Sequence, residues 1–136
     1  MKKRYFTKAL SIILISIIIL MSFSTTVSAR YTYIHNLSST ISISTSGLAK
    51  STGLVDPSNS STNTTLTVEL QKKTNGVWVL DGGPWSDSGT GTNTVALQGK
   101  KYVVHGTYRV VVTAKIYSSS GILLENESCI SPELTY

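Results

Sequence analysis

Several reactive residue types are scarce in this 136-residue chain, and each shortage excludes a class of protein. Cys129 is the single cysteine, so the chain cannot form an internal disulfide. His35 and His105 are the only histidines, and no G-x-S-x-G or comparable nucleophile motif accompanies them. A hydrolytic triad needs a nucleophile, a base and an orienting acid together. We therefore expect no catalytic residues, no cofactor and no enzyme activity.

The N-terminal segment has the pattern of a secretory signal peptide. A basic head precedes an apolar run over residues 9–23, and small residues stand at Val27 and Ala29. Serines interrupt this run, and it is shorter than the roughly 20 apolar residues that a membrane-spanning helix needs. No cysteine follows it directly to carry a lipid anchor. We predict a helical signal peptide over residues 1–29, cleavage between Ala29 and Arg30, and a secreted, extracellular protein.

Positive charge is also scarce once the predicted signal peptide is removed. Four of the twelve basic residues precede the cleavage site, whereas all seven acidic residues follow it, so eight basic and seven acidic residues remain. Nucleic-acid binding needs clustered Lys and Arg, and only Lys72-Lys73 and Lys100-Lys101 are adjacent. We expect no nucleic-acid partner and no metal site, and contact with a membrane only through the signal peptide before cleavage.

Alternation of apolar and polar residues is what the chain has in abundance. From residue 38 onward the hydrophobic period is two, which is typical of strands with one buried face. The clearest strands are predicted over residues 64–72 and 106–117. Their predicted core-facing residues are Leu66, Val68, Leu70, Tyr108, Val110, Val112, Ala114 and Ile116. Shorter strands are predicted over residues 39–45, 48–55, 77–80, 92–97 and 122–128.

About seven strands at this spacing predict an all-β, antiparallel β-sandwich over residues 38–136. Residues 30–37 are expected to be a leader or an extra edge strand. Asn75-Gly76 predicts a two-residue hairpin turn, because both residues tolerate positive φ. Glycine, proline and short polar residues predict loops over residues 58–63, 81–91 and 99–105.

The segment Gly106 to Ala114, which reads GTYRVVVTA, resembles the late strand of immunoglobulin-like and fibronectin type III domains. Residues 31–128 are also similar to an uncharacterised family of small secreted proteins from Gram-positive bacteria. The matching residues are Tyr31-Thr32-Tyr33-Ile34, Ile41-Ser42-Ile43-Ser44, residues 66–72, Trp78 with Trp85, and Tyr108-Arg109-Val110. These resemblances imply an immunoglobulin/fibronectin type III-like sandwich, and the family has no assigned activity or site.

Aromatic residues are the remaining candidates for ligand contact. Trp85, beside a Gly-Pro pair, and Tyr102 are the possible contact residues, whereas Trp78 and Tyr108 are expected to pack in the core. Asp81 and Asp87 flank a glycine-rich stretch, but calcium or glycosidase sites need a ligand pattern that this stretch lacks. Turn chemistry explains the stretch.

The sequence therefore favours a secreted, non-enzymatic structural or binding module acting at the cell surface or in the medium. An alternative is a carbohydrate- or cell-wall-binding module. A further alternative is an exported toxin, bacteriocin or protease inhibitor. The partner could be a cell-wall polysaccharide or another surface protein, contacted through the three predicted loops.

Overall fold

The computed structural model describes residues 31–136, and all of its regular elements are strands. The predicted signal peptide and its cleavage site between Ala29 and Arg30 lie outside the described residues. Among the described residues, no helix has the length and apolar character that a membrane crossing requires. The strands are β1 (Ile34–Ile43), β2 (Leu48–Pro57), β3 (Thr62–Thr74), β4 (Val77–Thr90), β5 (Val95–Tyr102), β6 (Thr107–Ser118), β7 (Leu123–Ile130) and β8 (Leu134–Thr135).

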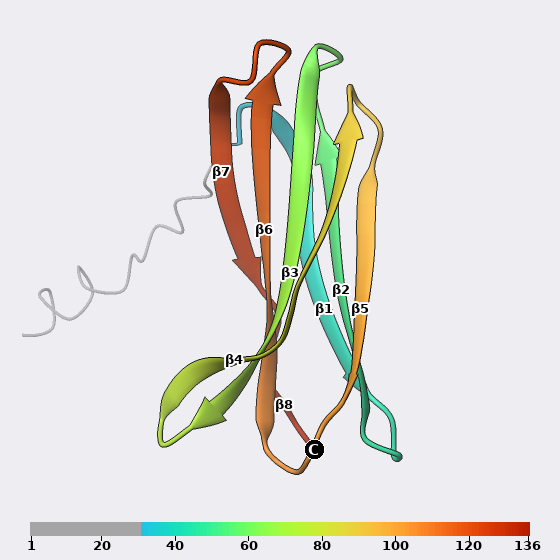
Figure 1. Ribbon diagram of the computed structural model, residues 1–136, viewed down its shortest axis with the longest axis vertical. Coiled ribbons are helices and arrows are strands. Elements are labelled where there is room, and N and C mark those ends of the chain that lie inside the picture. Colours follow the sequence, from blue (N-terminus) through green and yellow to red (C-terminus); the bar gives the residue numbers. More distant parts are fainter. Residues whose placement is uncertain (1–30) are drawn as a thin grey trace, which may run out of the picture. The chain divides into compact units, whose positions relative to one another are not determined.

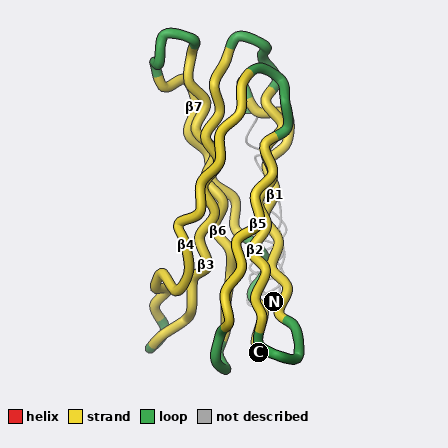
Figure 2. Tube along the Cα trace, turned by 45° about the vertical axis from the view of Figure 1, so that its right-hand side comes forward, coloured by secondary structure: helices red, strands yellow, loops and turns green. Residues whose placement is uncertain are grey.

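The strands form two antiparallel sheets that face each other (Figures 1 and 2). One sheet has the order β1-β2-β5, and the other has the order β4-β3-β6-β7, with the short β8 paired to the start of β6. In seven-stranded immunoglobulin domains the first, second and fifth strands likewise share one sheet, together with the fourth, and the third, sixth and seventh share the other. Here β4 lies beside β3 instead, in the place that an added strand takes in variable-type domains. The predicted immunoglobulin-like, antiparallel β-sandwich is confirmed.

The core lies between the sheets and is built from alternate residues of β2, β3 and β6. All eight residues predicted to face inward from the two long strands are buried, each with 0% or 1% of its surface exposed. On β2, the small residues Ala49, Ser51 and Gly53 are buried, and Gly53 leaves no space for a Cβ beside Val68 and Val112. Small side chains on β2 therefore let the two sheets approach each other closely.

Tyr108 shows how the start of β6 is tied to the preceding loop. Its ring is buried, and its hydroxyl donates a hydrogen bond of 2.7 Å to the carbonyl oxygen of Val104. A tyrosine near the start of the sixth strand that bonds back to the backbone a few residues upstream is the tyrosine corner of immunoglobulin-like folds. The expected packing role of Tyr108 is confirmed, with this bond added.

The loop predicted over residues 81–91 is wrong, because residues 81–90 continue β4. Two β-bulges explain the error: Val68 pairs with Trp85, Leu70 with Gly82, and Gln71 with Leu80, so β4 carries one extra residue at each step. Bulges bend a strand and shift its alternation without ending it. The predicted loop over residues 99–105 is also partly wrong, since β5 runs to Tyr102. At the N-terminus, β1 begins at Ile34, inside the predicted leader.

Candidate functional site

The most distinctive surface belongs to the far end of the β3–β4 hairpin, residues 71–80, which we call the β3–β4 arm. The last pair that β3 makes with β6 joins Lys72 to Tyr108, so beyond it β3 pairs only with β4. Asn75 and Gly76 close the arm with φ angles of 52° and 81°, as the predicted two-residue turn requires. The bulges in β4 lie at the base of the arm, and Figure 1 shows the arm bending away from the sandwich. The facing sheet therefore does not cover the arm.

Four consecutive apolar residues form the β4 side of the arm. Val77, Val79 and Leu80 have 62%, 42% and 53% of their surface exposed. Trp78 between them is half-buried, and it is not part of the core cluster. A run of exposed apolar residues is a defect in a folded protein unless it has a function. The arm is therefore the first candidate for a contact surface.

Trp78 is held on the outer face of the sheet by two cations. The Nζ atom of Lys73 lies 5.2 Å from the centre of the indole, and the Cζ atom of Arg109 lies 4.3 Å from it. These cation–π contacts keep the ring over charged side chains instead of core residues. Trp78 was expected to pack in the core, and this expectation is wrong because the bulges place the arm beyond the facing sheet.

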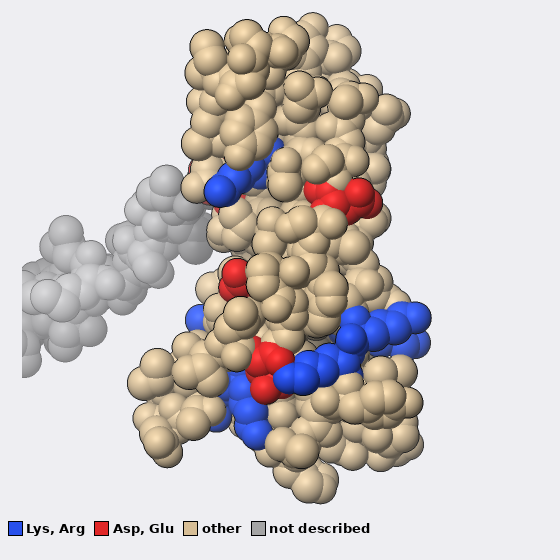
Figure 3. Space-filling view, in the orientation of Figure 1, with Lys and Arg blue, Asp and Glu red and all other residues tan. Residues whose placement is uncertain are grey.

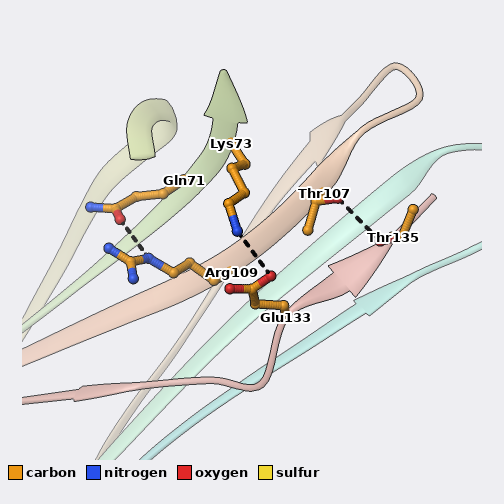
Figure 4. A network of polar contacts seen from close by, with 6 residues as sticks. All are labelled: Gln71, Lys73, Thr107, Arg109, Glu133 and Thr135. Atoms are coloured by element: carbon orange, nitrogen blue, oxygen red, sulfur yellow. Dashed lines mark hydrogen bonds and ion pairs between the residues drawn. The ribbon is translucent and has the colours of Figure 1, made fainter. Parts of the chain in front are cut away.

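A polar network fixes the two cations beneath Trp78 (Figure 4). The Nε atom of Arg109 donates a hydrogen bond of 2.9 Å to Oε1 of Gln71, and Nζ of Lys73 lies 3.6 Å from Oε2 of Glu133. The network joins β3, β6 and the segment that leads into β8, where Thr107 and Thr135 share a hydrogen bond of 3.1 Å. Arg109 is thus held by β3, and Lys73 by the segment that leads into β8.

Charge is unevenly distributed over the described residues. Seven Lys and Arg and seven Asp and Glu lie within residues 31–136. Six of the cations lie towards the end where β5 stops and β6 starts, and Figure 3 shows most of the blue side chains gathered in this part of the visible face. We call this set the basic band; it consists of Lys50, Lys72, Lys73, Lys100, Lys101 and Arg109. Asp81 pairs with Lys101 at 3.1 Å, and Glu133 with Lys73.

Trp85 and Tyr102, the two predicted contact residues, lie in different environments. Trp85 is half-buried and packs against the core, and its ring fills the space next to Gly99 on the facing sheet, where a Cβ would clash with it. Trp85 therefore lies between the sheets, beside the bulge that follows Val68, and not on the loop that the sequence predicts there. Tyr102 is 71% exposed at the end of β5, opposite Leu48. Ligand contact by either residue stays a prediction.

The histidines and carboxylates singled out in the sequence lie apart. His35 is on β1 near the end of β2, whereas His105 follows β5, near the start of β2, and stacks on Tyr136 with ring centres 4.7 Å apart. Asp81 and Asp87 are both on β4 but lie apart along it: Asp87 pairs with Leu66, and Asp81 lies at the bulge between Leu70 and Gln71. Within residues 31–136, no three His, Cys, Asp or Glu side chains form a group that could hold a metal ion.

Cys129 is on β7, at the opposite edge of the sheet from β4 and the arm. Its side chain is half-buried against the core, and this burial raises the pKa of the thiol, while a hydrogen bond with Ser39 lowers it to a smaller extent. Near it lies a groove of about 250 Å³, which is lined by Thr40, Ile41, Pro132, Glu133 and Leu134. Sequence reasoning missed this groove, because it forms between β1 and the C-terminal segment.

No family model matches the chain, and no curated protein has a similar sequence.

Proposed function

We propose that the protein is a secreted, non-enzymatic binding module that contacts its partner through the β3–β4 arm. One observation carries the proposal: residues 77–80 are all apolar, and three of them are exposed, whereas the alternate apolar residues of β3 and β6 are buried in the core. Exposed apolar patches beside polar residues are typical of interaction sites. The Asn75-Gly76 turn and continuous β3–β4 pairing fix the shape of the arm, which lowers the entropy cost of binding.

The basic band indicates the charge of the partner. Lys72 and Arg109 form no ion pair with any carboxylate of residues 31–136, whereas Lys73 and Lys101 are each paired with one. The surroundings of the arm therefore keep an excess of positive charge, which favours an anionic partner and speeds the encounter with it.

A second candidate is contact with a cell-wall polysaccharide through the outer face of the β1-β2-β5 sheet. Tyr102 is exposed there, and the next residues on this face, Lys50 and Lys100, are directly opposite each other. Two like charges in this position destabilise a sheet, and an anionic sugar would relieve their repulsion. Binding to purified peptidoglycan that is lost in Tyr102→Ala, with the fold intact, would support this candidate.

The proposal is tested by retention of the secreted protein on intact cells of its own host. Replacing Val79 and Leu80 together by serine removes apolar surface from the arm without touching the core. A matched control replaces Ile122 and Leu123, which are 64% and 50% exposed at the other end of the sandwich. We expect the arm variant to lose retention and the control to keep it, with equal thermal stability. Equal retention of the two variants would contradict the proposal.

A further inference from the structure

We infer that the partner of the β3–β4 arm is the surface of an anionic lipid bilayer, along which the β4 side of the arm lies. This inference rests on the proposed function and names the partner. It goes beyond the sequence, which predicts membrane contact only through the signal peptide.

The apolar residues of the arm point to both faces of the strand. Side chains alternate along a strand, so Trp78 and Leu80 lie on one face of the arm and Val77 and Val79 on the other. A flat protein surface would cover only one of these faces. The boundary between lipid headgroups and acyl chains surrounds an inserted edge and accepts apolar groups from both faces at once, with an affinity that grows with the apolar area buried.

Apolar and polar residues are separated between the two strands of the arm. The β3 residues opposite the apolar run are polar or cationic: Leu80 faces Gln71, Val79 faces Lys72, and Trp78 faces Lys73. When the β4 edge enters the interface, the β3 cations lie at the level of the phosphates. Each Lys or Arg near an anionic membrane contributes about 1 kcal/mol to binding.

Trp78 and the free edge of β4 indicate how deeply the arm enters the bilayer. Tryptophan is enriched at membrane–water interfaces, where its ring meets both apolar and polar groups, and Trp78 already lies between apolar neighbours and the cations Lys73 and Arg109. β4 is the last strand of its sheet, so its outer backbone groups have no strand partner. Such groups are not tolerated in the hydrocarbon centre. The arm therefore binds at the interface and does not cross the bilayer.

The test is sedimentation of the secreted protein with vesicles of phosphatidylcholine alone and of phosphatidylcholine with one quarter phosphatidylglycerol. We expect binding to the anionic vesicles, weaker binding at 0.5 M salt than at 0.1 M, and a blue shift of the Trp78 emission measured in Trp85→Phe. Val79→Ser with Leu80→Ser should weaken partitioning by roughly tenfold or more. Lys72→Gln should weaken it by about fivefold.

Two matched variants serve as controls. Ile122→Ser with Leu123→Ser removes similarly exposed apolar surface from the opposite end, and Lys115→Gln removes an exposed cation from β6 outside the basic band. Both should bind as the unmodified protein does. Equal losses in the arm and control variants would overturn the inference, and so would equal binding to neutral and anionic vesicles.

The cell-retention experiment separates this inference from the proposed function. If the arm variant loses retention on cells while the unmodified protein ignores anionic vesicles, the arm binds something other than lipid and only the inference fails. Loss of retention after the cells are treated with protease assigns the arm to a protein partner and has the same consequence. If the arm variant stays on the cells, the proposed function itself fails.

Discussion

One pair of strands, β3 with β4, has two halves that differ in what covers them. In the half that lies in the sandwich, Leu66, Val68 and Leu70 are fully buried against the facing sheet. In the other half, the β3–β4 arm, equally apolar residues at 77–80 have no facing sheet. Backbone pairing between β3 and β4 extends through both halves, and only the two bulges interrupt it. One hairpin therefore holds both a buried half, which belongs to the core, and an exposed apolar half.

The largest expected effect distinguishes the halves by stability. Leu66→Ala creates a cavity in the core and should lower the free energy of unfolding by about 2–5 kcal/mol. Leu80→Ala removes an exposed side chain and should change it by about 0.5 kcal/mol or less. Urea denaturation of both variants checks this, and similar losses in both would show that the arm is buried after all.

The second prediction concerns the tryptophan that belongs to the covered half. Gly99→Ala places a methyl group against the Trp85 ring, and such overpacking should cost about 1–3 kcal/mol. The cost should shrink in a Trp85→Leu background, because the two positions are in contact. A double-mutant cycle measured by thermal unfolding tests the coupling. Additive losses would mean that the ring does not fill the space beside Gly99.

The third prediction tests the bond that ties the sandwich together near the base of the arm. Tyr108→Phe removes the hydroxyl that donates to the Val104 carbonyl, and it should lower the free energy of unfolding by about 1 kcal/mol. Tyr102→Phe is the matched control, since Tyr102 is largely exposed. Equal stability of the Tyr108 variant and the parent would exclude a contribution from this tyrosine corner.

The smallest effect is expected for Cys129 on β7, at the opposite edge of the sheet from β4. Burial raises the pKa of the Cys129 thiol in the folded protein, so the neutral thiol is favoured. Its contribution to stability is present below the ordinary thiol pKa of about 8.5 and is lost as the pH rises through the higher folded pKa. At about pH 8.5, iodoacetamide should therefore alkylate the native protein more slowly than the urea-unfolded protein. Identical rates would show that this edge is as open as the arm.

Sequence periodicity was sufficient to predict β3 and β6, the two strands that supply most of the core. The inward residues of β3 and β6 alternate without interruption, because each long strand keeps one face on the core. The two-residue turn was predictable because Asn75-Gly76 is a local signal with a backbone cause. The sandwich follows from these strands and their spacing.

The bulged course of β4, the exposure of the arm and the place of Gly99 in β5 were not predictable, for physical reasons. Asp81, Gly82, Gly83 and Pro84 have the composition of a loop, but here they form bulges that keep the strand paired and reverse which tryptophan faces the core. Gly99 is also a residue type that is typical of turns, but it lies in β5, where its missing side chain leaves room for Trp85 of the other sheet. Both features depend on tertiary contacts. Within the arm, the Asn75-Gly76 turn had a local signal, whereas the exposure of the apolar run at residues 77–80 had none.

Hydrogen exchange of the protein bound to an envelope fraction of its host shows which end of the sandwich makes the contact. The amides of residues 71–80 should exchange more slowly when the protein is bound, while those of residues 118–124 at the opposite end should exchange at the rate of the free protein. Protection of residues 118–124 with an unchanged arm would contradict the account.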